Sequence, residues 1–392
     1  MCEFLSEGKG KVAFTIIMAS TRRLLVLTLC LLPWLQMVES GFSVQRFQSA
    51  RPITSSVPIT KDGVYLISVI IDPCRGCYSR LHLFCDCQGT KRYFFTAYGK
   101  SIYSHAEVAV GLKKTDTLFI KRTGNVEGPS SLSVVYVAEL SSFYSTVMNG
   151  RVTKNSPVTY TTRLTPNGWI PLKNMDRETT FTVPVTGMYW VTGRTLPMST
   201  SVFMEVKSGP RSLFLVCAED TKPVSASGAF RLTAGSTVWA TTQGGVTYAP
   251  HTLISAVYLA GNKKPNTYPY EHLAFTATYD KQLYSAPGYV LQFRRVLTNY
   301  GYLYVDGYTE IRRSGSYMVS IRPDPITTPT TVVSLFVNGQ SRWDVYAEDG
   351  VPSGATISIT LQAGSYVAVK HTNSITTILE DGTMFSIAFI QP

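Results

Sequence analysis

Hydrophobic and polar residues alternate over short runs from residue 41 to the C-terminus. The runs are rich in Val, Thr, Tyr and Phe, and clusters of Gly, Pro, Asn and Ser separate them; examples are residues 63–69, 179–183 and 356–361. Short strands at regular spacing with turn residues between them are typical of β-sandwiches and barrels. No segment sustains the 3.6-residue apolar period of an amphipathic helix. The pattern predicts an all-β chain.

This strand pattern occurs three times. A Gly-x-Tyr motif begins an apolar strand at Gly63, Gly187 and Gly315, which follow one another at nearly equal spacing. Other segments recur in the same order: the hairpin turns Gln88-Gly89, Ser208-Gly209 and Asn338-Gly339; Val216–Asp220 and Val345–Asp349; Leu112–Asp116, Leu232–Ser236 and Leu361–Ser365; and the closing strands Ser133–Val137, Ser255–Leu259 and Ser386–Ile390. The period is far longer than the ~20–50 residues of solenoid repeats, so each copy is predicted to be a domain with its own core.

The N-terminal segment 1–40 has the features of a secretory signal peptide. Arg22 and Arg23 precede an apolar run at 24–34, and small-residue cleavage chemistry follows at 38–40. The run is shorter than the ~20 residues of a membrane span and contains Pro33. An uncleaved signal anchor and a buried core helix are the alternatives. We predict a secreted chain that begins near Gly41 and has no membrane span after cleavage.

The predicted domain boundaries are 41–140, 141–260 and 272–392, with a linker at 261–271. In copies two and three, the opening segments Ser142–Ser145 and Ala274–Ala277 stand well before the Gly-x-Tyr motif. In copy one, only residues 41–62 lie between the predicted cleavage site and that motif. Copy one is therefore predicted to lack the opening strand of its sheet. An exposed sheet edge of this kind calls for a neighbour to cover it.

Copy three resembles the globular head of complement C1q, within the tumour-necrosis-factor-like jelly rolls. The matching segments are Ala274–Ala277, Val296–Gly301 followed by Tyr304, Gly315–Ser320, Leu335–Gly339 and Phe385–Ile390. The sequence departs from the family at Ser365, where an aspartate is usual, and it has no collagen stalk. The resemblance implies tandem jelly-roll sandwiches of ten strands. It also implies heads that associate as trimers and bind proteins, glycans or microbial surfaces, in some cases with calcium.

Short joints between the copies favour association within the chain. The first joint, near 138–142, is almost nil, and the second is the short linker 261–271. Tethers of this length hold neighbouring heads at effective concentrations of about millimolar. We expect an internal pseudo-threefold trimer, with an ordinary homotrimer of chains as the alternative.

Charge composition points to anionic partners. Hydrophobic residues make up 44% and charged residues 16% of the chain, which excludes a disordered protein. The net charge is +11, and about +10 remains without the leader. Two arginine pairs with tyrosines between them are the candidate site for sulfated or phosphorylated glycans: Arg294, Arg295, Arg312, Arg313, Tyr300 and Tyr302. The alternative is a solvated sheet face. Nucleic acid is not an expected partner of a secreted chain.

Five cysteines follow the leader. The spacing predicts a disulfide between Cys74 and Cys77, while Cys85 and Cys87 point to one face of a strand and are expected to pair with other partners. A zinc site formed by this CxxC and CxC set is the alternative. Cys217 stands where copy three has Tyr346, so it is either a core thiol or a cysteine that bridges two chains.

Catalytic and metal motifs are scarce. The five histidines are scattered, and no nucleophile elbow, phosphate-binding glycine loop or zincin motif occurs. Adjacent acids recur at one repeat position, and they are weak calcium candidates or simply turns: Glu219, Asp220, Glu348 and Asp349. We expect no enzyme activity and no cofactor other than calcium.

The leading functional hypothesis is a secreted C1q-like recognition protein that binds extracellular proteins or anionic glycans, for example on microbial surfaces in innate immunity. A receptor-binding ligand of the tumour-necrosis-factor kind, an extracellular matrix component and a carbohydrate-active jelly-roll enzyme are the alternatives.

Overall fold

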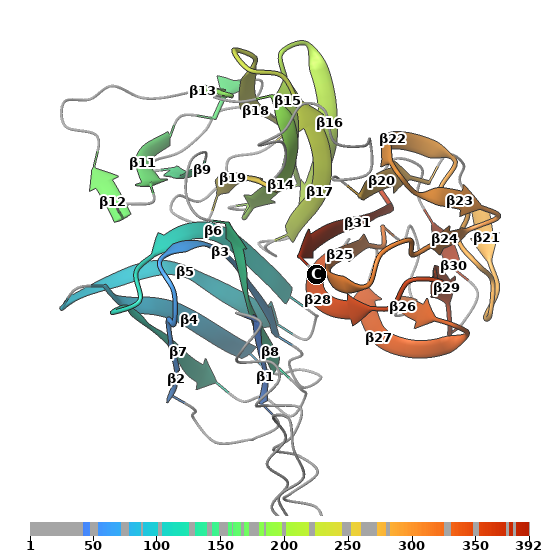
Figure 1. Cartoon of the computed structure of the whole chain (residues 1–392). Coiled ribbons are helices and arrows are strands. Elements are labelled where there is room, and N and C mark those ends of the chain that lie inside the picture. The colour runs from blue at the N-terminus through green and yellow to red at the C-terminus, as the bar shows by residue number, and fades with distance from the viewer. Residues whose placement is uncertain are drawn as a thin grey trace, which may run out of the picture. The chain divides into compact units, whose positions relative to one another are not determined.

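The computed structural model shows strands joined by turns and loops (Figure 1). It describes residues 42–47, 54–71, 78–87, 89–100, 104–124, 130–138, 143–148, 156–158, 160–165, 168–171, 180–183, 186–197, 201–218, 224–244, 252–259, 273–279, 283–324, 331–347, 353–373, 376–378 and 382–391. Within these ranges every regular element is a strand, which confirms the all-β prediction. No helix in the same ranges is long and apolar enough to cross a bilayer. The predicted signal peptide and the linker 261–271 lie outside them.

The strands follow the three copies of the repeat. Copy one contains β1 (Phe42–Phe47), β2 (Thr54–Pro58), β3 (Gly63–Ile71), β4 (Tyr78–Cys87), β5 (Thr90–Lys100), β6 (Ser104–Leu112), β7 (Thr117–Gly124) and β8 (Ser130–Ala138). Copy two contains β9 (Phe143–Met148), β10 (Ser156–Pro157), β11 (Tyr160–Thr165), β12 (Gly168–Pro171), β13 (Thr180–Thr182), β14 (Gly187–Thr195), β15 (Val202–Ser208), β16 (Arg211–Ala218), β17 (Val224–Leu232), β18 (Thr237–Gly244) and β19 (Leu253–Tyr258). Copy three contains β20 (Ala274–Thr278), β21 (Leu283–Ser285), β22 (Arg295–Tyr300), β23 (Leu303–Val305), β24 (Tyr308–Glu310), β25 (Gly315–Arg322), β26 (Thr331–Val337), β27 (Gln340–Ala347), β28 (Ala355–Leu361), β29 (Tyr366–His371), β30 (Thr376–Ile378) and β31 (Met384–Gln391).

Each copy is a jelly-roll sandwich of two antiparallel sheets, as the repeat pattern predicts, and copy three has a further two-stranded sheet of β21 and β30. The sheets that contain the Gly-x-Tyr strand, here called inner sheets, have the orders β1-β8-β3-β6, β12-β11-β9-β19-β14-β17 and β22-β20-β31-β25-β28. The outer sheets have the orders β2-β7-β4-β5, β10-β18-β15-β16 with β13 beside β18, and β23-β24-β29-β26-β27. The corresponding strands of the three copies therefore occupy corresponding places.

Local sequence signals account for the strand ends. Gly63, Gly187 and Gly315 are the first residues of β3, β14 and β25, as predicted. Asn338 and Gly339 have φ angles of 52° and 79° in the turn between β26 and β27. Two consecutive positive φ angles are what a two-residue hairpin turn with right-handed strand twist requires, and Asn-Gly supplies them at least steric cost.

One expectation about copy one needs correction. Its inner sheet does begin with a strand, because β1 is placed beside β8, where β9 and β20 stand beside their own closing strands. Among the described strands of copy one, none corresponds to β11 or β22. Residues 48–53, between β1 and β2, lie outside the described residues.

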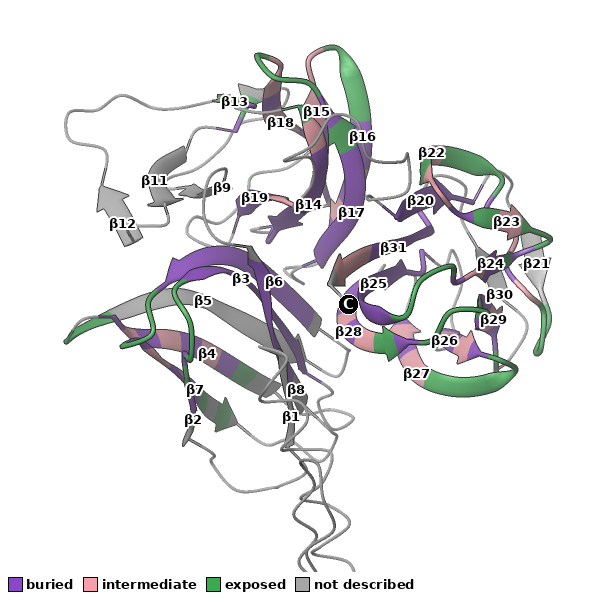
Figure 2. Cartoon of the chain, viewed as in Figure 1, coloured by how far each residue is buried: buried purple, intermediate pink, exposed green. Residues whose placement is uncertain are grey.

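The central strands of the inner sheets are buried on both faces. Every residue of β3 and of β25 is buried, and β14 and β17 each have one exception (Figure 2). Antiparallel sheets in a single sandwich commonly expose one face to water. One face of each inner sheet covers the core of its own sandwich. The other face therefore lies against a further layer of protein within the unit Val44–Pro392.

That further layer is another copy of the repeat. Ile70 of copy one belongs to the apolar cluster of copy three, which also contains Phe275 and Tyr317. Met384 and Leu297 of copy three pack against the cluster of copy two. Strands β6, β17 and β28, one from each copy, contact one another. The apolar packing thus continues from one copy to the next.

Candidate functional site

Each inner sheet carries a row of polar residues at the same level. The rows are Ser133–Ser68–Glu107 in copy one, Ser255–Thr192–Ser227 in copy two and Ser386–Ser320–Thr356 in copy three, and the members of each row are directly opposite one another. All nine residues are buried. Most buried polar groups are hydrogen-bonded, and several bonds of these rows cross between copies, whereas Ser133 Oγ and Ser386 Oγ have no partner among the described residues.

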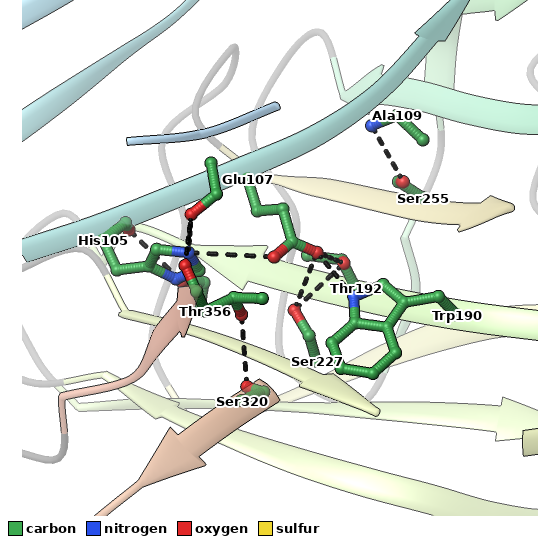
Figure 3. A network of polar contacts seen from close by, with 11 residues as sticks. His105, Glu107, Ala109, Trp190, Thr192, Ser227, Ser255, Ser320 and Thr356 are labelled. Atoms are coloured by element: carbon green, nitrogen blue, oxygen red, sulfur yellow. Dashed lines mark hydrogen bonds and ion pairs between the residues drawn. The ribbon is translucent and has the colours of Figure 1, made fainter. Parts of the chain in front are cut away.

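Glu107 of copy one lies at the centre of this site (Figure 3). Its Oε1 accepts hydrogen bonds from Trp190 Nε1 at 2.8 Å, from Ser227 Oγ at 3.1 Å and from Thr192 Oγ1. Thr192 Oγ1 and Ser227 Oγ also lie 3.0 Å apart, but each hydroxyl has a single proton and donates it to Oε1, so this contact adds no further hydrogen bond. All three donors belong to copy two, from β14 and β17. One carboxylate oxygen of copy one therefore accepts three hydrogen bonds from its neighbour.

His105 lies two residues before Glu107 on β6 and connects all three copies. Its Nδ1 is 2.6 Å from Ser225 Oγ of copy two, and its Nε2 is 3.1 Å from Ser68 Oγ. Ser68 donates to the carbonyl oxygen of Thr356 in copy three at 2.7 Å. With that donation made, Ser68 accepts from His105, which assigns the neutral ring with its proton on Nε2.

Burial governs the charge states of this pair. Desolvation raises the pKa of Glu107 above its ordinary value, and the hydrogen bonds from Thr192 and Trp190 act against that shift. Desolvation, followed by the nearby positive charge of Arg194, lowers the pKa of His105 to about 3. The imidazole is therefore neutral throughout the physiological pH range. Glu107 Oε2 is 3.8 Å from the ring Nε2 and accepts no hydrogen bond from the residues that the structure describes.

Copies two and three are joined by separate contacts. Thr276 donates to the carbonyl oxygen of Ala229 at 2.9 Å and accepts from the Ala229 amide at 3.0 Å. Arg322, which is 1% exposed, donates to the carbonyl oxygen of Leu215 and lies 3.7 Å from an Asp324 carboxylate oxygen. At Gly354, a Cβ atom would stand 2.3 Å from the backbone oxygen of Ser225. The two backbones thus approach too closely for any side chain there.

These buried hydrogen bonds join the three copies to one another. Glu107 is 0% exposed, and its Oε1 already accepts three hydrogen bonds. His105 is 3% exposed and has hydrogen bonds on both ring nitrogens. Neither group is open to a ligand in solution. We assign the site a role in holding the three copies in one order.

The two predicted arginine pairs do not converge. Arg295, the first residue of β22, is level with Arg322, the last residue of β25. The register across the sheet runs from Arg295 through Thr278 and Met384 to Arg322. Arg313 lies two residues before β25 begins at Gly315, and Gly315 is seven residues, or roughly 23 Å at ~3.3 Å per residue, from Arg322. All four arginines of the two pairs are exposed, at opposite ends of the sheet.

The tyrosines between these pairs are occupied or buried. Tyr300 is half-buried, and its hydroxyl accepts from Arg231 of copy two at 3.2 Å. Tyr302 is 6% exposed, and burial raises the pKa of its hydroxyl well above the ordinary value. Tyr302 is therefore a core residue and not part of a ligand surface. Tyr302 lies two residues after the end of β22, where the chain turns toward the interior, and its ring packs in the apolar cluster that contains Phe275.

The cysteine predictions are partly overturned. Cys85 and Cys87 form a disulfide with each other, with a Cα–Cα distance of 5.3 Å, so the expectation of other partners is wrong. Residues two apart on a strand point to one face, which brings the two sulfurs together. Cys217 remains a half-buried thiol on β16, beside Phe203 of β15, so it is not a fully buried core residue. Cys74, Cys77 and the calcium candidates Glu219, Asp220, Glu348 and Asp349 lie outside the described residues.

Sequence reasoning missed the pair His105 and Glu107. The available signal was their place in an otherwise apolar strand, 104–112, where two ionisable groups lie at i and i+2. Such residues point to one face, and a buried face with two ionisable groups predicts a specific partner. Their partners Trp190 and Ser225 carry no corresponding signal.

Comparison with known proteins yields similarities of structure only. No protein-family model and no curated protein matches the sequence. The chain is similar to pika GITRL (15% identity, 30% of this chain and 97% of the other, TM-score 0.22) and to Eiger TNF of S. frugiperda (17%, 32% and 97%, TM-score 0.23). It is also similar to a triple jelly-roll protein from the turret assembly of an archaeal virus (10%, 90% and 90%, TM-score 0.21). At these identities and TM-scores the similarity concerns the jelly-roll architecture alone.

Proposed function

We propose that the chain is a secreted recognition protein of the C1q and tumour-necrosis-factor kind, without enzyme activity, whose three jelly rolls form a pseudo-trimer within one polypeptide. In this proposal the central strands of the inner sheets serve association, and the outer sheets, the edge strand β22 and the loops bind an extracellular protein or an anionic glycan. A role in recognising microbial surfaces fits this surface chemistry.

The hydrogen bonds of Glu107 are the observation that supports the proposal best. Copy one has a glutamate where copies two and three have Ser227 and Thr356. A trimer of three separate chains that joined through their first copies would bring three carboxylates together, and like charges at one buried site are unfavourable. One glutamate with serine and threonine at the other two positions avoids that repulsion. The asymmetry favours association of three different copies over three identical ones.

Light scattering on the purified mature chain tests the assembly. We expect the mass of one chain at all concentrations. Three chains at every concentration would contradict the internal pseudo-trimer. A dimer that disappears on reduction would instead indicate a bridge through Cys217.

The ligand class is tested separately, on an array of anionic glycans at two salt concentrations and with or without calcium. The excess of Lys and Arg predicts binding that weakens with salt, because exposed charges are screened beyond ~8 Å at physiological ionic strength. The double variants R294A/R295A and R312A/R313A should each weaken binding, and their effects should add because sites more than ~10 Å apart act independently. Unchanged affinity in both would remove the arginines from the proposal.

A further inference from the structure

A second cluster of reactive groups lies in copy one, at the end of β4. Cys85 and Cys87 alternate with Asp86 and face the interior, where they are 0% and 7% exposed. Register pairs Cys85 with Leu118 and Asp86 with Thr117, so the next residue, Asp116, stands across from Cys87. The three side chains therefore share one face at one end of the sandwich.

Asp116 is placed there by the turn that leads into β7. Its amide donates to the Lys113 carbonyl at 2.8 Å, and its Oδ2 accepts from the Lys113 amide at 2.8 Å. Its backbone oxygen accepts from Ile59 at 3.0 Å. The side chain is thus oriented by the local backbone and is not free to turn toward solvent.

The other oxygen of this carboxyl group is unsatisfied. Asp116 is 4% exposed, and Oδ1 has no hydrogen-bond partner among the described residues. A buried carboxylate oxygen without a partner has lost its hydration and gained no hydrogen bond in exchange, which is unfavourable. The two sulfurs lie close to this carboxyl group, since one ligand atom from each of Cys85, Cys87 and Asp116 lies within 4.8 Å of the others. Two sulfurs and a carboxylate oxygen at this separation are a donor set for a divalent metal ion.

We propose that Cys85, Cys87 and Asp116 form a redox-gated site for a divalent metal of the zinc type. The disulfide form cannot bind it, because neither sulfur is then a thiolate. A dithiol reductant supplies two electrons and two protons, becomes a disulfide itself and leaves Cys85 and Cys87 as thiols. Metal binding then releases the two thiol protons, and two thiolates with one carboxylate oxygen coordinate the ion.

Zinc suits this donor set. It takes thiolate sulfur at ~2.3 Å and carboxylate oxygen at ~2.0–2.2 Å in tetrahedral sites, and three protein ligands leave the fourth position for water. Tetrahedral geometry at these lengths places the two sulfurs about 3.8 Å apart, within the spread of the cluster. The ion would also give Asp116 Oδ1 the partner it lacks.

The test is a titration of the full mature chain with Co²⁺ and then Zn²⁺, in a Cys217→Ser background, before and after reduction with dithiothreitol and its removal without oxygen. We expect one equivalent of Co²⁺ with thiolate-to-metal absorption in the reduced protein only, and its displacement by Zn²⁺. Binding of equal strength in the oxidised protein would overturn the proposal, as would no binding in the reduced protein.

Matched variants locate the site. Asp116→Asn should weaken Co²⁺ binding at least about tenfold, whereas Asp62→Asn, an exposed aspartate that accepts from the Lys114 amide in the same region, should not. The double variant C74S/C77S should retain binding, and its loss would assign the metal to those cysteines. If Asp116→Asn fails to fold, alkylation of the unsubstituted protein decides. Zn²⁺ should slow modification of Cys85 and Cys87 in mapped peptides, and equal rates with and without Zn²⁺ would overturn the proposal.

Discussion

At the scale of residues, Glu107 combines full burial with three hydrogen-bond donors on one oxygen. Removing a carboxyl group from water is costly unless it is paired and hydrogen-bonded. The donors offset part of this cost. The pKa of Glu107 is still raised, so burial disfavours the charged carboxylate more than the hydrogen bonds favour it. Glu107 therefore contributes specificity of association more than stability.

Glu107→Gln should change the pH dependence of stability. A carboxyl pKa that is raised by folding gives stability that is complete below the unfolded value of about 4.5 and is lost as pH rises through the folded value. The glutamine keeps an oxygen for Trp190 and Thr192 but does not ionise. Urea unfolding at pH 5, 6 and 7 should show the variant gaining on the wild type as pH rises. Glu205→Gln, at a surface ion pair with Lys207, is the control, and a constant difference at all three pH values would contradict the expectation.

His105→Gln should act on the acid side. Because folding lowers the pKa of His105 from 6.5 to about 3, its contribution is complete above pH 6.5 and is lost as pH falls toward 3. The loss amounts to at most about 1.4 kcal/mol per pH unit. We expect the unfolding free energy of the variant to fall less steeply below pH 6.5 than that of the wild type. The same substitution at the half-buried His82 is the comparison, because the pKa of that residue is also lowered. Equal slopes of unfolding free energy against pH in the wild type and in His105→Gln would contradict a buried neutral imidazole.

At the scale of elements, the inner-sheet strands have two buried faces and two sets of partners. β17 pairs with β14 within copy two and contacts β6 and β28 of the other copies. β28 begins at Ala355, directly after Gly354, where the backbone of copy three lies against the Ser225 carbonyl of copy two. The absence of a side chain at this point lets the strands come together.

Gly354→Ala should separate β28 from β17. The new Cβ would lie 2.3 Å from the Ser225 oxygen, a backbone atom, so a strand has to shift at a cost of about 1–3 kcal/mol. Hydrogen exchange should accelerate around 225–227. Gly364→Ala is the control: its Cβ meets nothing within 4 Å, and its positive φ predicts a local cost of about 1 kcal/mol without faster exchange in β17. Unchanged exchange in Gly354→Ala would contradict the close approach.

At the scale of the whole molecule, shared apolar clusters and the Glu107 site predict cooperative unfolding. Residues of one copy pack into the clusters of another, as Ile70 does in copy three and Met384 in copy two. Domains that share buried contacts lose them together, whereas independent domains unfold in separate transitions. We expect a single thermal transition for the residues 44–392.

Glu107→Lys should break this cooperativity. An ammonium group in place of the carboxylate would leave the Trp190 N–H without its acceptor and bury a positive charge, and breaking such a buried site costs about 3–5 kcal/mol. Calorimetry should show a lower first transition and a second, later one. The same charge reversal at the half-buried Glu205 should leave one transition. One unsplit transition at the wild-type temperature in Glu107→Lys would mean that the copies do not depend on this site.

The sequence by itself determined the all-β class, the threefold repeat, the first residues of β3, β14 and β25 and the turn at Asn338 and Gly339. Those features follow from local chemistry, namely alternation along a strand and the φ angles that Gly and Asn allow. Only the tertiary structure decided which polar residues meet. Glu107 finds Trp190, Thr192 and Ser227 at sequence separations of 83, 85 and 120, and the Arg295 and Arg313 pairs fall at opposite ends of one sheet. Contacts of this range depend on strand register and on packing between sheets, because a hydrogen bond is set by position in space and leaves no pattern along the chain.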